Sequence, residues 1–207
     1  MNYRVLTIAR EYGSGGAEIA TLAAKSLSWK LLDRNLIDKI AHAAGVDVES
    51  VTAYDEHVDS WLHRISRPLW NAGLQPVATI SPVDIFDSEA MVRVTREIVE
   101  EAHSAGECVI VGRAAQCILQ GCPDVFHVFV YAPRAERLHR VQERLHSKAE
   151  AERMLREVDE ERASYVKLYF GRDWDNRQLY DLMISSRAGC RATASIITAA
   201  MGAQREA

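Results

Sequence analysis

The sequence has no long apolar run and no excess of positive charge, and each absence excludes a class of protein. No stretch approaches the roughly 20 apolar residues of a membrane-spanning helix. The first apolar run is too short, and too soon followed by glycines, to be the core of a signal peptide. A net charge of -4 gives no attraction to nucleic acid or to an anionic membrane. We therefore expect a cytoplasmic protein with neither nucleic acid nor membrane as a partner.

The cysteines and histidines lack the spacings that metal sites need. Cys108, Cys117, Cys122 and Cys190 do not form the short pairs of a structural zinc site. The seven histidines are scattered, and none has two further ligands at suitable spacing. We expect free, structural cysteines in a reducing compartment.

What the chain does have is an alternation of short apolar runs and longer amphipathic segments. With 207 residues, 48% of them hydrophobic, it is long enough for one domain with its own core, and we expect a single domain over residues 1–207. The apolar runs predict strands, and the segments between them show helical periodicity. The order predicts an α/β fold with a parallel sheet covered on both faces. The expected strands are 5–9, 29–32, 108–111, 126–131 and 180–185; the expected helices are 17–27, 34–44, 47–69, 88–105, 134–167 with a break near Ser147, and 191–201; residues 71–87 are expected to form a loop.

A glycine-rich segment, Arg10-Glu-Tyr-Gly-Ser-Gly-Gly16, lies between the first expected strand and helix. Closely spaced glycines let backbone N–H groups turn towards a phosphate, and the start of a helix adds a favourable partial charge. A tight turn without a ligand would use the same glycines. The segment also lacks the Lys and Ser or Thr that complete a phosphate-binding loop.

Six segments, this one included and taken in order, carry a resemblance that covers nearly the whole chain. The chain resembles the cytidylate kinase-like family of the P-loop nucleoside monophosphate kinases. This resemblance implies a three-layer fold, an acceptor lobe at 34–105 and an Arg-rich lid at 145–178. It implies transfer of the γ-phosphoryl group of ATP to a nucleoside monophosphate, first of all CMP, with Mg²⁺. The segments are the Ala-Arg-Glu and Gly-Ser-Gly-Gly start, Trp29–Asp33, Val109–Arg113, the Ala132-Pro-x-x-x-Arg137-x-x-Arg140 stretch, Asp159-x-x-Arg162-x-x-Tyr165 and Tyr180–Ser186.

The resemblance also implies roles for individual residues, each beside a structural alternative. Asp33 could instead cap the next helix, Arg113 could pair with an acid at the sheet rim, and an Arg-rich helix could simply be a solvated face. We favour the last interpretation for Arg153. The implied roles are ATP phosphate binding for Gly13, Ser14, Gly15 and Gly16, acceptor binding for Asp33 and Arg113, catalysis for Arg10, Arg162 and Arg172, and a lid position for Arg156.

Three departures from the family pattern bear on mechanism. Gly16 replaces the lysine of the phosphate-binding loop, Glu18 replaces its threonine, and Val111 and Ala114 replace two acids. We hypothesise that Arg10 supplies the missing positive charge and that Glu11 or Glu18 holds Mg²⁺.

Two other functions stay open beside the kinase. The missing residues favour a nucleotide or phosphate sensor that does not turn its ligand over. The acceptor could also be a different small molecule, because the expected loop at 71–87 has no functional interpretation. Nearby apolar residues could form either the core of the acceptor lobe, which we favour, or a homodimer surface; they are Trp61, Leu62, Ile65, Leu69 and Trp70.

Overall fold

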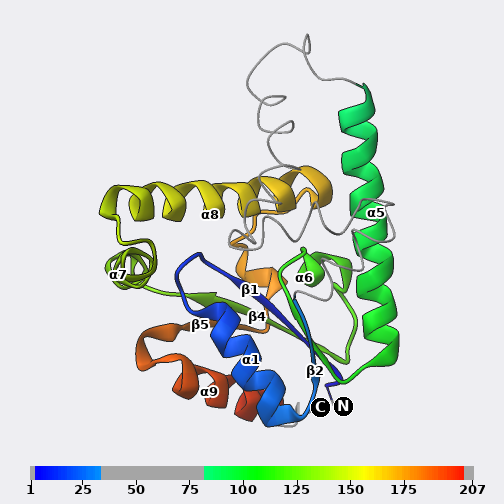
Figure 1. Cartoon of the computed structure of the whole chain (residues 1–207). Helices are drawn as coiled ribbons and strands as arrows, with labels where there is room; N and C mark the ends of the chain where they lie inside the picture. The colour runs from blue at the N-terminus through cyan, green and yellow to red at the C-terminus, as the bar shows by residue number, and fades with distance from the viewer. Residues whose placement is uncertain (1–2, 34–81, 203–207) are drawn as a thin grey trace.

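The centre of the molecule is a five-stranded sheet in which all strands run parallel (Figure 1). The computed structural model describes residues 3–33 and 82–202, with the side chains of 82–91 and 94 left aside. The spatial order is β2-β3-β1-β4-β5. These strands confirm the parallel sheet predicted from the apolar runs; they are β1 (Val5–Arg10), β2 (Lys30–Leu32), β3 (Cys108–Val111), β4 (Val125–Tyr131) and β5 (Leu182–Ser185).

Helices cover both faces of this sheet, which makes three layers. Successive strand residues point to opposite faces. Leu6 and Ile8 accordingly pack in one core, with α1 (Gly16–Leu27) and α9 (Cys190–Gly202). Val5 packs in the other core, with α5 (Pro82–Ala105) and α6 (Ala115–Ile118). Because both faces are buried, the strands read as continuous apolar runs.

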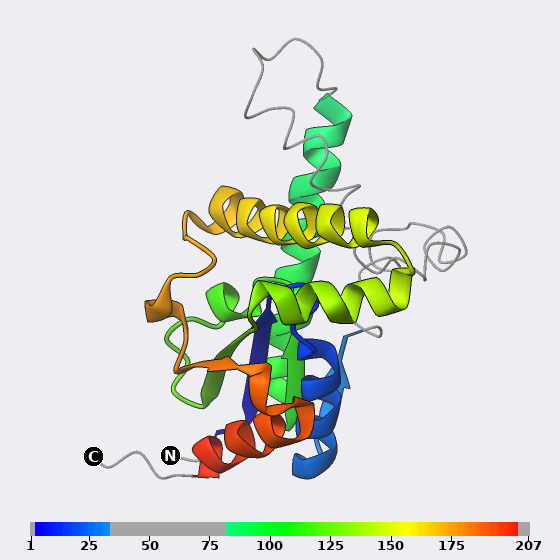
Figure 2. The ribbon, with the colours of Figure 1, turned by 90° about the vertical axis from the view of Figure 1, so that its left-hand side faces the viewer.

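Two helices, α7 (Arg134–Leu145) and α8 (Lys148–Phe170), pack against each other beyond the carboxyl ends of the strands (Figures 1 and 2). They come from the long helical segment predicted at 134–167. The predicted break is confirmed, because the Ser147 side chain caps α8 by accepting a hydrogen bond from the Glu150 N–H. Two short 3₁₀ turns follow, η1 (Arg177–Leu179) and η2 (Ser186–Ala188).

One boundary prediction was wrong, and others lie outside the described residues. Residues 82–87 were predicted as loop, but α5 begins at Pro82. Proline is favoured at the first position of a helix. The predicted helices at 34–44 and 47–69, the rest of the loop at 71–81 and the apolar group around Trp61 fall outside the described ranges.

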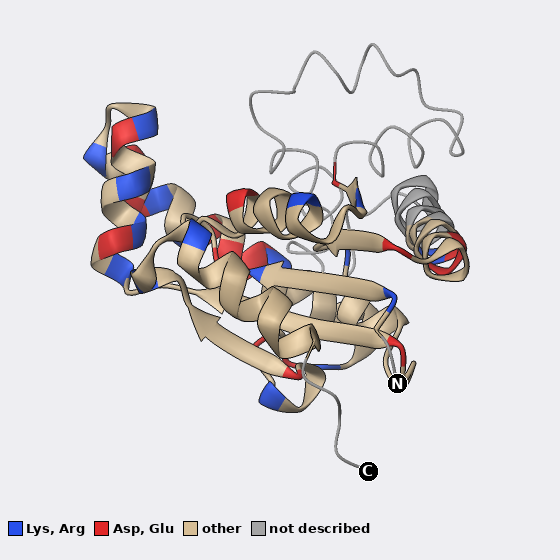
Figure 3. Cartoon of the chain, turned by 90° about the horizontal axis from the view of Figure 1, so that it is seen from below, with Lys and Arg blue, Asp and Glu red and all other residues tan. Residues whose placement is uncertain are grey.

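Charged residues lie on the helices and at the strand ends, and the body of the sheet is almost uncharged (Figure 3). Strands β1, β3 and β4 contain a single Lys, Arg, Asp or Glu residue, which is Arg10. No helix in residues 3–33 and 82–202 is long and apolar enough to cross a membrane. The chain leaves β3 through α6 and enters β4 on the other side of β1, so the carboxyl end of β1 is a topological switch point. Ligands of open α/β sheets bind at such points.

Candidate functional site

The glycine-rich loop connects β1 to α1 at this switch point. Gly13 and Gly15 have left-handed backbones, with φ of 76° and 81°. A Cβ on Gly13 would lie 2.9 Å from Val141 Cγ2, so the loop packs directly on α7. Gly15 is the N-cap of α1 and, as a glycine, has no side chain that could form a capping hydrogen bond. The first turn of α1 therefore faces the loop without a capping side chain, which is the arrangement that binds phosphate.

Ser14, in the middle of the loop, has a hydroxyl without a partner among the described residues. The residue is fully buried, and its Oγ has no hydrogen-bond partner there. Its carbonyl oxygen is occupied, because Ser186 Oγ donates to it at 2.6 Å. Arg140 Nη1 donates to the Gly13 carbonyl at 3.3 Å and to Ser186 Oγ at 3.1 Å. Side chains of α7 and η2 thus donate hydrogen bonds to the loop carbonyls. The buried Ser14 hydroxyl remains a candidate ligand-binding group, because a buried polar atom without a protein partner calls for a functional explanation.

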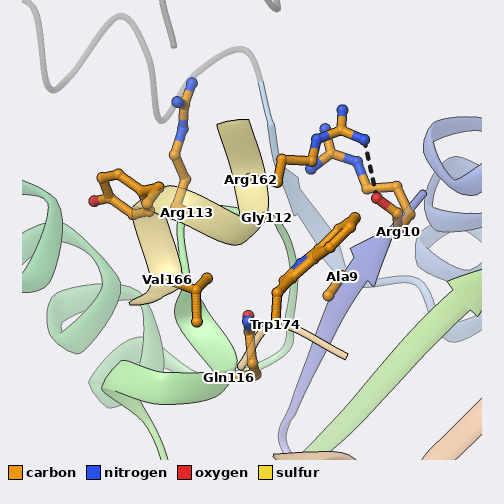
Figure 4. A pocket seen from close by; sticks show the side chains of 10 residues that line it. Ala9, Arg10, Gly112, Arg113, Gln116, Arg162, Val166 and Trp174 are labelled. Atoms are coloured by element: carbon orange, nitrogen blue, oxygen red, sulfur yellow. Dashed lines mark hydrogen bonds between the residues drawn. The ribbon is translucent and has the colours of Figure 1, made fainter. Parts of the chain in front are cut away.

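A cavity of about 40 Å³ lies at the carboxyl ends of β1 and β3 (Figure 4). A water molecule needs roughly 10–15 Å³ by the same kind of measure, so the cavity suits a group the size of a phosphate. Arg10, Arg113 and Arg162 line it, and none of the described residues that line it is acidic. Figure 4 shows Arg162 next to Arg10, with Arg113 across the cavity. Planar guanidinium groups at the wall of a small cavity bind oxyanions well.

Arg113 stands in a left-handed turn directly after β3. Gly112, Arg113 and Ala114 have successive φ values of 73°, 58° and 52°. For the two residues with side chains this conformation costs roughly 1–2 kcal/mol each. Hydrogen bonds hold the turn, from the Gly112 N–H to the Ile8 carbonyl at 3.0 Å and from the Ala115 N–H to the Gly112 carbonyl at 3.1 Å. Strained backbone of this kind concentrates at functional sites.

Asp159 on α8 joins the glycine-rich loop to two arginines. Its Oδ1 accepts a hydrogen bond from the Tyr12 N–H at 2.7 Å, and its Oδ2 accepts one from Arg137 Nη1. Arg162 Nη1 lies 3.5 Å from Asp159 Oδ1 and donates to the Arg10 carbonyl at 2.9 Å. Burial raises the pKa of Asp159, while the Tyr12 N–H and the charges of both arginines oppose this rise. Asp159 therefore fixes where α8 places Arg162 at the cavity.

The remaining predicted residues divide between the site and its surroundings. Asp33 follows β2 and is half-buried; because Leu32 pairs with Ile110, it lies at the same sheet edge as Arg113. Arg156 on α8 and Arg172 in the turn after it are exposed and do not line the cavity. The exposed Arg153 pairs with Glu150 and Glu157, as the solvated-face interpretation predicts.

Both glutamates considered for Mg²⁺ are engaged elsewhere. Glu11 Oε2 accepts a hydrogen bond from the Ala132 N–H at 3.0 Å and lies 3.3 Å from Arg137 Nε. Burial raises the pKa of the Cys190 thiol, and the neighbouring Glu18 carboxylate raises it further. No group of three His, Cys, Asp or Glu residues suited to a metal ion occurs in the described part of the chain. The described residues do not fit a Mg²⁺ ion held directly by protein carboxylates.

Among the polar and aromatic residues that line the cavity, sequence reasoning assigned no role to Gln116, Tyr165 and Trp174. Tyr165 lies on one face of α8 with Asp159 and Arg162, so the spacing of that motif could have assigned it. Trp174 packs its ring on Phe129 at 5.1 Å, and a single Trp in a polar turn gives no signal of that contact. Gln116 is almost fully buried in α6, and burial of an amide is not visible in the sequence.

Solved structures with this fold include several kinases. An uncharacterized protein from Eubacterium ventriosum matches with a TM-score of 0.69 and 19% identity, over 97% of this chain and 99% of that chain. Shikimate kinase from Bacteroides thetaiotaomicron matches with a TM-score of 0.54 and 10% identity, over 96% and 98%. A gluconokinase from Sinorhizobium meliloti matches with a TM-score of 0.51 and 11% identity, over 98% and 94%. At such identities the likeness shows the fold. No curated protein sequence matches the chain.

The sequence profile of one family spans both the loop and the cavity. The profile of the cytidylate kinase-like family matches residues 5–188, from the start of β1 to the end of η2. This range includes the glycine-rich loop, Arg113 and Arg162, and it confirms the resemblance inferred from the ordered motifs. With the fold of the P-loop kinases around a cationic cavity, the chain belongs to the cytidylate kinase-like family.

Proposed function

We propose that the protein is an ATP-dependent phosphotransferase whose acceptor is a nucleoside monophosphate, with CMP as the first candidate. The observation that carries this proposal is the cavity lined by Arg10, Arg113 and Arg162 at the carboxyl ends of β1 and β3, together with the start of α1, which has no capping side chain. Phosphoryl transfer needs mostly positioning and neutralisation of oxygen charge. Cations from three separate elements around one small cavity supply both.

In this proposal the loop binds the donor and the sheet edge binds the acceptor. Backbone N–H groups of Gly13, Gly15 and Gly16 and the Ser14 hydroxyl hold the ATP phosphates, while the Ser14 N–H donates to the Glu11 carbonyl at 3.3 Å. Asp33 and Arg113 hold the nucleoside monophosphate, with the Arg113 guanidinium on its phosphate. Arg162 neutralises the γ-phosphoryl group as its bond to the β–γ bridging oxygen breaks and a bond to an acceptor phosphate oxygen forms. Arg156 and Arg172 are exposed in this structure. In the proposal they contribute to catalysis only if the segment at 145–178 closes over the bound substrates as a lid.

ATP, when bound, supplies the phosphoryl group, and Mg²⁺ enters with it. The described residues offer no carboxylate at the cavity, so we assign Mg²⁺ no protein ligand and derive no step through it. This lack also favours a second candidate function, a sensor of the same fold that binds nucleotide without turnover. A third candidate keeps the chemistry and changes the acceptor, since neighbours of this fold are named for shikimate and gluconate.

The test is ADP formation from ATP with Mg²⁺ across a panel of nucleoside monophosphates, beside calorimetric binding of ATP. We expect turnover with CMP, and we expect Arg113→Ala to raise the KM for the acceptor. Arg153→Ala is the matched control, because it removes an arginine that pairs with Glu150 and Glu157 away from the cavity. Binding of ATP without turnover of any acceptor would favour the sensor, and absence of binding would refute all three candidates.

A further inference from the structure

We propose that Arg10 supplies from the end of β1 the positive charge that a lysine usually supplies from within the phosphate-binding loop. We further propose that Gly16 is a glycine because the Arg10 side chain fills the space of its side chain, and that the guanidinium end of Arg10 packs against Gly112. This inference rests on the proposed phosphotransferase function and deepens it, since it assigns the cation that meets the transferred group.

Gly16 is the first evidence, because neither its backbone nor its position explains a glycine. It opens α1, and its φ lies outside the left-handed region where glycine is needed, unlike that of Gly13 or Gly15. Glycine inside a helix is less stable than alanine by roughly 0.5–1 kcal/mol. A Cβ on Gly16 would lie 2.5 Å from Arg10 Cβ and 2.7 Å from Arg10 Cγ. The aliphatic part of Arg10 thus occupies the place where a loop lysine would begin.

Gly112 marks the other end of the same side chain. A Cβ on Gly112 would collide with Arg10 Nη1. The guanidinium group therefore reaches from the start of α1 across to the turn after β3. This path takes the positive charge into the wall of the cavity that Arg113 and Arg162 also line. Ser14 Oγ would lie 3.5 Å from the Cβ of Gly16, so the buried hydroxyl is on the same path.

The surroundings of Arg10 fix its position. Its carbonyl oxygen accepts a hydrogen bond from Arg162 Nη1 at 2.9 Å, and Asp159 holds Arg162 in turn. Arg10 is also the one Lys, Arg, Asp or Glu residue in β1, β3 and β4. An anion in the cavity would lie against both guanidinium groups, and such charge-assisted hydrogen bonds are among the strong ones.

The test moves the positive charge between the two positions. Arg10→Ala removes it, and the double variant with Arg10→Gly and Gly16→Lys returns it from the loop, where loss of the Arg10 Cβ frees the space that the lysine stem needs. The double variant with Arg10→Gly and Gly16→Ala is the matched control without charge. The readouts are kcat with the acceptor found in the panel, and calorimetric affinity for ATP and for inorganic tripolyphosphate. Thermal unfolding reports whether each variant is folded.

We expect Arg10→Ala to lower kcat and anion affinity by roughly 10- to 100-fold, as for loss of a charged hydrogen bond. The lysine double variant should recover at least about tenfold of this loss, and the alanine double variant none. Gly16→Lys alone should lower the Tm, because its stem collides with Arg10. If Arg10→Ala does not fold, Arg10→Lys and Arg10→Gln replace it, since both keep a long stem and only the first keeps the charge.

The outcomes separate this inference from the function on which it rests. If the wild type binds neither ATP nor tripolyphosphate, the proposed function fails and the inference fails with it. If the wild type binds and reacts but Arg10→Ala or Arg10→Gln matches it, the inference alone is overturned. Equal recovery by the lysine and alanine double variants would also overturn it, because Arg10 would then act only by shape.

Discussion

Replacing Asp159 with asparagine keeps the shape of the side chain and removes the negative charge between two arginines. The asparagine Oδ1 can still accept the Tyr12 N–H, which now lies 2.7 Å from Asp159 Oδ1. Its amide group, however, would face the donors of Arg137. The side chains of Arg137 and Arg162 are only 12% and 8% exposed, so their charges cannot turn to solvent.

Removal of one partner from a buried ion pair costs about 3–5 kcal/mol. We take the lower end, about 3 kcal/mol, because Glu11 still lies beside Arg137 and the Tyr12 hydrogen bond survives. For a chain of this size, 1 kcal/mol corresponds to roughly 2–4 °C, so the Tm should fall by roughly 6–12 °C. Urea unfolding followed by circular dichroism gives the free energy directly.

Arg153→Ala is the control for this experiment, since its salt bridges on the same helix are exposed. Exposed pairs contribute at most about 1 kcal/mol, and we expect no larger effect. If Asp159→Asn were as stable as the wild type to within about 1 kcal/mol, the ion pairs would be solvent-screened and our account of the network would be refuted.

Three other perturbations probe the loop, a buried histidine and the thiols. Gly13→Ala should lower the free energy of unfolding by about 1–3 kcal/mol, because alanine is strained at a φ of 76° and its Cβ would press on Val141, and a urea curve unchanged from the wild type would contradict the packing. Burial lowers the pKa of His127, while the charge of Asp181 opposes this shift, so His127 binds a proton more readily in the unfolded chain than in the folded one. The free energy of unfolding should therefore fall by up to about 1.4 kcal/mol per pH unit as the pH drops below roughly 6.5. His127→Asn should lose this pH dependence when both proteins are unfolded with urea at a series of pH values. Burial raises the pKa of Cys117 to about 11, so its alkylation by iodoacetamide at pH 8, followed by peptide mass spectrometry, should be at least tenfold slower than in the urea-unfolded chain.

Local sequence signals predicted much of the fold. The strands β1, β3 and β4 are buried on both faces and so are apolar throughout, which made their runs visible. The helix break at Ser147 was visible because a capping serine acts on a residue only three positions away. The start of α5 at Pro82 was missed because proline was treated as a loop residue rather than as a helix start.

The sequence by itself determined the α/β order and the glycine-rich turn before α1, because these depend on residues close together along the chain. It also determined the family, because the family is marked by short local motifs that follow in a fixed order. Only the tertiary structure decided which side chains meet at the cavity. Asp159 reaches the Tyr12 N–H across 147 positions, and Trp174 reaches the cavity from a polar turn. The reason for a glycine at position 16 is likewise the Arg10 side chain from the neighbouring strand. Such contacts depend on the direction in which folded elements point their side chains, and spacing along the chain does not encode that direction.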